Sequence, residues 1–222
     1  MTCGTGPKKV LSFANGTKTL ASLAKEGKEV TITNTDICNM ALSHIAVGGI
    51  VSMDESSEAA KQCKIHYEHT RRRLLGMYNW NFAARETKLA LLEETVPGFD
   101  FAYAYPEECL KIYYVYEEGE APYKEEHPRD YKVVAATGVR RAVATDVEKA
   151  WCSYTADIKD PDMMSEEFIA GFSHLLASDL SMALTGNASL MQTNLQLAQM
   201  SVTQAKWESV VEAQRRTRYP DG

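Results

Sequence analysis

The sequence predicts an α+β protein, with a four-helix bundle formed by N- and C-terminal helix pairs and an antiparallel β-sheet or sandwich lobe inserted between them. Three stretches support this order. Apolar residues recur at helical spacing in 34–82 and again in 159–216, whereas β-branched and aromatic residues tend to alternate in 83–158. We expect one domain overall, with two lobes. An extended arm at 1–33 precedes it, and a tail at 217–222 follows.

The arm at 1–33 is rich in Gly, Thr and Lys and has few apolar residues. It therefore has too little apolar surface to form a core of its own. The stretch 19–27 has the composition of two helical turns. We expect the arm to order against a neighbouring subunit, and a flexible tail is the alternative.

The first helix is predicted at about 36–46. Asn34 and Thr35 are suitable N-caps, and Asp36 favours the positive end of the helix dipole. Gly48 and Gly49 are expected to end the helix.

The second helix is predicted from after residue 57 to about Leu75, with Gly76 as its C-cap. Arg71, Arg72 and Arg73 lie in its last turns, where positive charge complements the helix dipole. We expect one of these arginines to lie on the apolar stripe and to pair with a carboxylate. The stripe follows a three-four spacing and consists of Ala60, Cys63, Tyr67, Arg71, Leu74 and Tyr78.

Strands are predicted where β-branched or aromatic residues lie between turn residues. Their ranges are 87–94, 111–118, 131–137, 140–145 and 150–158. The acidic stretch 117–130 is a poor strand and is expected to be an extended loop between two strands.

Two antiparallel helices are predicted at about 165–185 and 188–216, joined by a short turn. The second has a coiled-coil-like seam, which we expect to be intramolecular core rather than an oligomer contact. The seam residues are Met191, Leu195, Ala198, Val202 and Ala205.

No catalytic motif is present: the sequence has no Walker loop, GxGxxG, GxSxG or HExxH. Cys63, His66 and His69 are spaced so that they drift around one helix, which argues against a metal site. His44 and His174 lie near apolar stripes and are expected to be satisfied core or interface residues. We predict that the protein is not an enzyme and has no cofactor or metal.

Adjacent glutamates are numerous, but such exposed pairs lack the distinct environments that catalytic carboxylates need. They are Glu93-Glu94, Glu107-Glu108, Glu117-Glu118 and Glu125-Glu126.

The net charge of −6 argues against a large phosphate-binding footprint. Residues 91–130 alone carry three basic and eleven acidic side chains. No apolar run approaches the ~20 residues of a membrane span. The five cysteines form no CxxC pattern, and free thiols suit a reducing cytosol.

Several stretches match one family in order. The family motifs are N-x-A-L-x-x-I-G, I-x-S, R-x-x-L-L, W-x-F-A and F-x-Y-x-Y-P-x-D-C-L. Their residues here are Asn39, Ala41, Leu42, Ile45, Ile50, Ser52, Arg71, Leu74, Leu75, Trp80, Phe82, Ala83, Phe101, Tyr103, Tyr105, Pro106, Cys109 and Leu110. Over roughly 34–216 the chain resembles the tail tubular protein A family, the head-to-tail adaptors of short-tailed bacteriophages. Three features depart from the family pattern: Ala46 replaces a glycine, Glu108 replaces an aspartate, and the N-terminal arm is longer.

The resemblance implies a structural virion protein, assembled in the host cytoplasm, that forms a ring of twelve subunits between portal and tail or nozzle. Such adaptors are not enzymes. They extend the DNA channel, support tail attachment, help to retain the genome and take part in its ejection. Viral DNA would pass without sequence-specific contacts, and no membrane is involved. The alternatives are another neck or stopper-type virion protein or, from a different class, a soluble DNA-binding or enzymatic protein.

Two candidate surfaces follow from this reading. The acidic residues Glu117, Glu118, Glu125 and Glu126 are expected to line the channel and repel DNA, or to contact the next tail protein. The exposed, charged C-terminal end is the candidate portal contact, with Arg215, Arg216, Arg218 and Tyr219.

The stretch 77-MYNWNFA-83 follows directly after 71-RRRLLG-76. Trp80 and Phe82 alternate with Asn79 and Asn81, so the aromatic rings are expected to face one way and the amides the other. We expect Trp80 and Phe82 to seal the junction between bundle and sheet. A platform for stacking on nucleic acid is the alternative.

Overall fold

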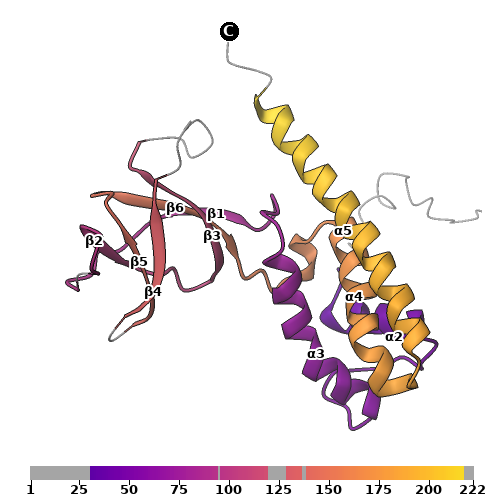
Figure 1. The fold of residues 1–222 in the computed structure, drawn as a ribbon. Coiled ribbons are helices and arrows are strands. Elements are labelled where there is room, and N and C mark those ends of the chain that lie inside the picture. The colour runs from indigo at the N-terminus through magenta and orange to yellow at the C-terminus, as the bar shows by residue number, and fades with distance from the viewer. Residues whose placement is uncertain (1–30, 95, 120–128, 137–138, 218–222) are drawn as a thin grey trace, which may run out of the picture. The chain divides into compact units, whose positions relative to one another are not determined.

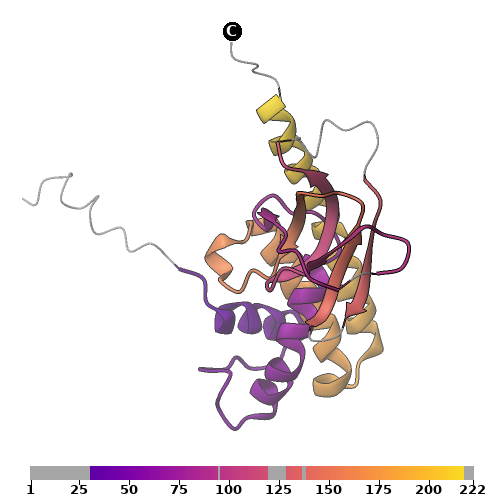
Figure 2. The same ribbon diagram turned by 90° about the vertical axis from the view of Figure 1, so that its left-hand side faces the viewer.

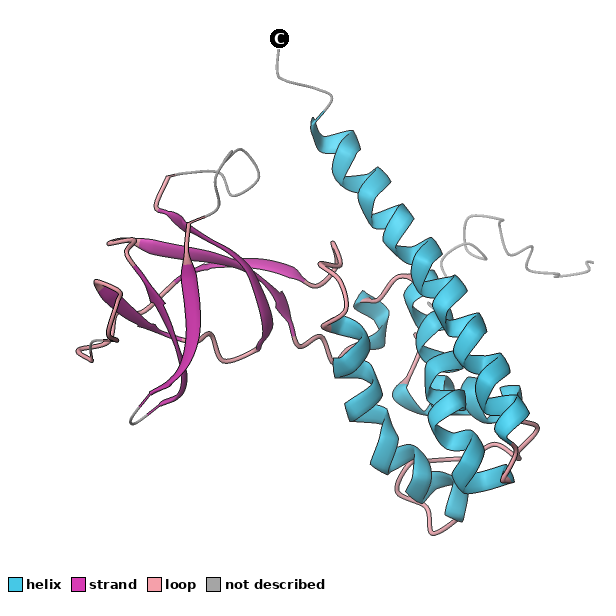
Figure 3. Ribbon diagram, viewed as in Figure 1, coloured by secondary structure: helices cyan, strands magenta, loops and turns pink. Residues whose placement is uncertain are grey.

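The computed structural model describes residues 31–94, 96–119, 129–136 and 139–217 (Figure 1). The described residues from Ile32 onward belong to one compact unit. Four helices and six strands are described in this part of the chain, and they are segregated along it (Figure 3). The protein is therefore α+β, as the sequence predicts. The predicted arm at 1–33 lies almost wholly outside the described residues.

The first described helix, α2, spans Asn34–His44. Its N-cap is Thr33, one residue before the predicted caps. The Thr33 hydroxyl accepts from the Asp36 backbone N–H at 3.2 Å, and the Asp36 carboxylate accepts from the Thr33 backbone N–H at 2.9 Å. The Thr33 hydroxyl also donates to the Asp36 carboxylate at 2.6 Å, and this bond, together with the one from the Thr33 backbone N–H, lowers the pKa of Asp36. The prediction of Asn34 or Thr35 as the cap was wrong because the reciprocal capping box outweighs either residue alone.

Helix α2 also ends before Gly48 and Gly49. The chain turns instead at Ala46, which has a positive φ of 56°. The Asn39 side chain then holds the returning segment: it donates to the Ile50 carbonyl at 3.0 Å and accepts from the Ile50 N–H at 2.7 Å. A Cβ atom at Gly49 would come within 3.0 Å of the Asn39 side-chain oxygen, so this glycine permits the close approach.

Helix α3 spans Glu58–Leu75 and begins at Ser57, whose hydroxyl accepts from the Ala60 N–H. Gly76 is its C-cap, as predicted, although its backbone is right-handed. The predicted apolar stripe is confirmed for its members within the helix, which are all buried: Ala60, Cys63, Tyr67, Arg71, Leu74. Its last predicted member, Tyr78, lies beyond the helix end and is only half-buried.

The strands form two three-stranded antiparallel sheets, which lie in front in Figure 2. One sheet has the order β1-β6-β3, with β1 Ala84–Lys88, β6 Ala150–Ala156 and β3 Cys109–Glu117. The other has the order β2-β5-β4, with β2 Phe101–Ala104, β5 Val139–Thr145 and β4 Tyr131–Ala136. A second core, separate from that of the helices, lies among these strands and includes Tyr103, Val143 and Cys152.

Two strand predictions need correction. β1 begins at Ala84 and ends at Lys88, rather than covering 87–94. β2 was not predicted as a strand at all, because its four residues directly follow a turn and are too few to show a clear alternation.

The last two helices are α4, Glu166–Thr185, and α5, Ala188–Thr217. The 3-10 turn η1, Pro161–Met163, precedes α4. Helix α4 packs against each of α2, α3 and α5. It is also long and apolar enough to span a membrane, contrary to the sequence prediction, but 61% of its apolar window is buried inside the protein. A buried core helix has the same composition.

The predicted seam of α5 is only partly confirmed. Ala198, Val202 and Ala205 are buried, whereas Leu195 is 40% exposed and Asn194 lies in the buried row in its place. The Asn194 amide is satisfied by the Leu190 carbonyl and by His174, which is why a polar residue is accepted there. At Gly171 the two helices come so close that a Cβ atom would lie 3.0 Å from Val202.

Candidate functional site

The end of α3 and its connection to β1 hold two of the motifs that carry the family resemblance, R-x-x-L-L and W-x-F-A. Trp80 is fully buried, and its indole N–H donates to the Leu74 carbonyl at 3.1 Å. Its ring lies edge-on to Phe168 of α4, with 5.1 Å between centroids, and 6.2 Å from the ring of Phe82. Trp80 and Phe82 are predicted to seal the junction between bundle and sheet, and their ring contacts described here are with Phe168 of α4 and with each other. A buried indole has no face available for stacking on a base.

The prediction that the rings of Trp80 and Phe82 face one way and the amides of Asn79 and Asn81 the other is only partly confirmed. Asn81 is exposed, and its amide donates to the Ser209 carbonyl at 2.7 Å and to Glu212 Oε2 at 3.1 Å. Asn79, in contrast, has a buried side-chain oxygen with no hydrogen-bond partner among the described residues. The segment 81–83 is a turn rather than a strand, so its side chains do not alternate strictly.

Arg71 anchors the other side of this connection. It is the arginine predicted to pair with a carboxylate: its guanidinium donates to Asp157 at 2.7 Å and to Glu68 at 2.6 Å. It also donates to the Ile158 carbonyl. Burial alone would lower the pKa of Arg71, but the two carboxylates raise it above its usual value. The network ties the end of α3 to the segment that follows β6.

His44 and His174 form a stacked pair between α2 and α4, with ring centroids 3.9 Å apart. His44 Nε2 lies 3.1 Å from the Ser173 hydroxyl, and His174 Nδ1 lies 3.0 Å from Asn194 Oδ1. Both histidines are thus satisfied, as predicted. Burial and the neighbouring His174 lower the pKa of His44.

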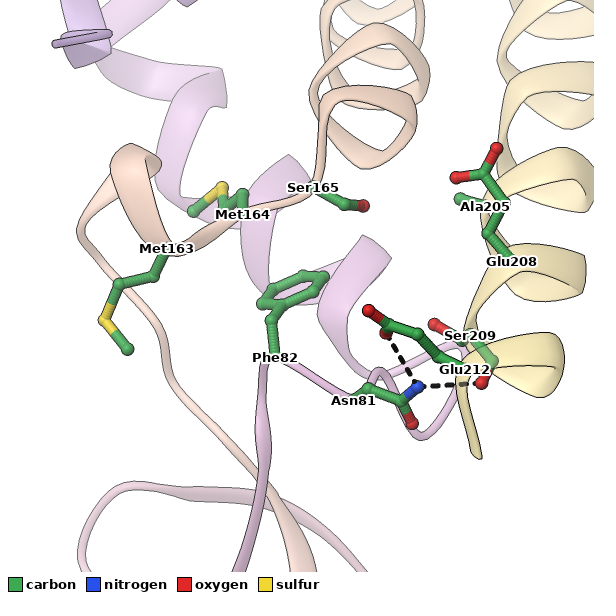
Figure 4. A pocket seen from close by; sticks show the side chains of 9 residues that line it. All are labelled: Asn81, Phe82, Met163, Met164, Ser165, Ala205, Glu208, Ser209 and Glu212. Atoms are coloured by element: carbon green, nitrogen blue, oxygen red, sulfur yellow. Dashed lines mark hydrogen bonds between the residues drawn. The ribbon is translucent and has the colours of Figure 1, made fainter. Parts of the chain in front are cut away.

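A pocket lies beside the α3–β1 connection, with a volume of about 300 Å³ (Figure 4). Its lining comes from the 81–82 turn, from the η1–α4 junction and from α5. The residues are Asn81, Phe82, Met163, Met164, Ser165, Ala205, Glu208, Ser209 and Glu212. Only Phe82 was expected at a functional position. The lining comes from three segments far apart in the sequence, so no local pattern could reveal it.

The predicted acidic surface is only partly described. Glu117 and Glu118 are exposed at the end of β3, and Glu118 pairs with Lys88 of β1 at 3.1 Å. Glu125 and Glu126 lie outside the described residues. The structure therefore describes only two of the four glutamates, and Glu118 is already paired.

The predicted portal contact lies at the limit of the described chain. The backbone at Arg215 and Arg216 belongs to α5. Their side chains, and the whole of Arg218 and Tyr219, lie outside the described part.

Cys63, His66 and His69 do not converge: Cys63 is fully buried, and His69 is exposed. Within the described ranges, no group of three or more His, Cys, Asp or Glu residues could hold a metal ion. Four cysteines lie in this part of the chain, all buried and all free thiols.

No protein-family model matches the chain, and no curated protein matches its sequence.

Proposed function

We propose that the chain is a structural head-to-tail adaptor of a bacteriophage virion. In this role it forms a homo-oligomeric ring, a dodecamer, between the portal protein and the tail or nozzle protein. The ring extends the DNA channel, supports tail attachment and genome retention, and lets DNA pass during ejection without sequence-specific contacts. It acts without catalytic chemistry.

The observation that carries the proposal is the position of the motif residues. Arg71, Leu74, Leu75, Trp80 and Ala83 are all fully buried at the connection between helices and sheet. Residues that contact solvent are exposed, whereas residues that define a fold are buried. These five motif residues are therefore of the kind that report a common architecture.

The turn after α2 gives further support. The family has a glycine at the position of Ala46, and Ala46 has a positive φ of 56°. Only glycine enters this region without steric strain, so the family residue suits the conformation that this chain adopts. We also propose that the four helices, packed around α4, form the bundle expected of such an adaptor.

The ring is tested by negative-stain microscopy and mass measurement of the full chain, with and without portal protein. A ring that stacks on the portal supports the proposal. A chain that stays monomeric with portal and is retained on specific DNA would overturn it.

The two candidate surfaces have their own tests. Replacing Glu117, Glu118, Glu125 and Glu126 with Gln should alter ejection kinetics if these residues line the channel, and unchanged kinetics would sink that role. Deleting 213–222 should abolish portal docking. Normal docking of the shortened chain would exclude the C-terminal contact.

A further inference from the structure

The pocket beside the α3–β1 connection combines apolar and acidic groups. Phe82, Met163 and Met164 line one side, and Met163 is 46% exposed (Figure 4). Glu208 and Glu212 lie on the other side, one turn apart on α5. Its volume of about 300 Å³ is at the small end of the range for ligand pockets. It suits a single long side chain rather than a large cofactor.

Neither carboxylate has a counter-charge among the side chains that the structure describes, a set that ends before Arg215 and Arg216 of α5. The Glu208 carboxylate accepts from the Gln204 amide at 3.2 Å, and that of Glu212 accepts from the Asn81 amide at 3.1 Å. Neither forms an ion pair with a residue that the structure describes. No Lys, Arg or His is among the described residues that line the pocket.

The N-terminal end of α4, where the helix dipole is positive, borders the pocket at Ser165. This partial positive charge is already compensated. The Ser165 hydroxyl accepts from the Phe168 N–H, and Glu166 and Glu167 lie in the first turn of the same helix. The pocket therefore keeps two negative charges next to an aromatic ring and a thioether.

We propose that this pocket binds a lysine or arginine side chain presented by a partner protein. The apolar stem lies along Phe82 and Met163, and the cationic head pairs with Glu208 and Glu212. The charge of the pocket excludes anionic side chains, and a neutral side chain would leave the carboxylates unpaired. The proposal rests on the adaptor function above, which supplies the docked partner, and it adds a surface that is distinct from the C-terminal tail.

The test uses the full chain with ¹³C-labelled methionine methyl groups. n-Butylguanidinium is the probe, and n-butylurea is its neutral control of nearly the same shape. We expect saturable shifts of the Met163 and Met164 resonances, assigned with Met163→Leu and Met164→Leu, and at least ten-fold weaker binding of the urea. The Glu208→Gln/Glu212→Gln double variant should weaken binding of the probe at least ten-fold. Glu107→Gln, which removes an exposed charge from the turn before β3, should not.

Three results would overturn the proposal: no saturable shift, equal binding of probe and neutral control, or undiminished binding by a folded double variant. Resonances that shift with protein concentration in the absence of probe would assign the pocket to a second copy of the chain instead. Portal-docking measurements separate this from the adaptor function. A ring that stacks on portal while the probe fails to bind refutes the pocket alone, whereas normal probe binding without any ring refutes the adaptor.

Discussion

The guanidinium of Arg71 donates to the carboxylate of Asp157 at 2.7 Å, and the Arg71 side chain is fully buried. The two residues are 86 positions apart in the chain. One belongs to the last turns of α3, and the other follows the last strand. The pair therefore joins the start and the end of the β-rich insertion, with the guanidinium fully buried and the Asp157 side chain only 14% exposed.

Removing one member of this pair is expected to be severely destabilising. Arg71→Ala leaves Asp157 without its closest cationic partner, and breaking a buried pair in this way lowers the free energy of unfolding by about 3–5 kcal/mol. Arg72 is the matched control, because it lies 3.5 Å from the same carboxylate but is 54% exposed. Arg72→Ala should lower stability by less than about 1 kcal/mol. Urea unfolding measures both, and equal losses would contradict the buried role of Arg71.

Replacing Ala46 with glycine is expected to stabilise the protein. A left-handed backbone strains a residue with a Cβ atom by about 1–2 kcal/mol, and part of this gain is offset by the freedom of glycine in the unfolded chain. We expect a net increase of about 1 kcal/mol in the free energy of unfolding. Ala183→Gly, at an exposed position of α4, should instead destabilise by about 1 kcal/mol. A loss of stability in Ala46→Gly would show that φ at this position is not strained.

Acidification is expected to weaken the contact between α2 and α4. The pKa of His44 in the folded protein lies below its unfolded value, which is about 6.5. The folded state therefore binds the proton less readily than the unfolded state, and the free energy of unfolding falls as the pH drops below about 6.5 towards the folded pKa. Urea unfolding at pH 7.5, 6.5 and 5.5 measures the slope. His44→Gln should flatten it, whereas His69→Gln, on the exposed face of α3, should leave it intact.

Trp80 is expected to affect stability and not nucleic-acid binding. Trp80→Ala removes a fully buried ring and should lower the free energy of unfolding by about 3–5 kcal/mol. Trp80→Phe keeps most of the packing and loses the hydrogen bond to Leu74, so its loss should be smaller. Fluorescence titration with single-stranded DNA should leave Trp80 emission unchanged in a variant that lacks Trp151 and Trp207. Quenching of Trp80 emission by DNA would support the alternative, in which this segment stacks on nucleic acid.

Long periodic segments could be predicted from the sequence because each contains its own signal. The stripe on α3, including its buried arginine, and the paired helices at the C-terminal end repeat over many turns. The short strand β2 and the cap at Thr33 could not be found in this way. β2 is defined by its pairing with β5, and the cap is defined by a reciprocal pair of hydrogen bonds rather than by residue type alone.

The pocket is even harder to predict from the sequence than β2 or the Thr33 cap. Glu208 and Glu212 read as ordinary exposed residues of an amphipathic helix, and Met163 reads as part of a break between elements. Their shared surroundings follow only from the packing of α5 against α4 and the path of the 81–82 turn. The two carboxylates have no ion-pair partner among the described residues, and this property depends on the three-dimensional packing around them.

The amide of Asn81 has a mechanical consequence. This single side chain donates both to the Ser209 carbonyl and to Glu212, so it fastens the late turns of α5 to the link that leads into the first strand. A force applied to that end of α5 would therefore also act on the β-rich insertion. Such a force would act first on the residues that lead into β1.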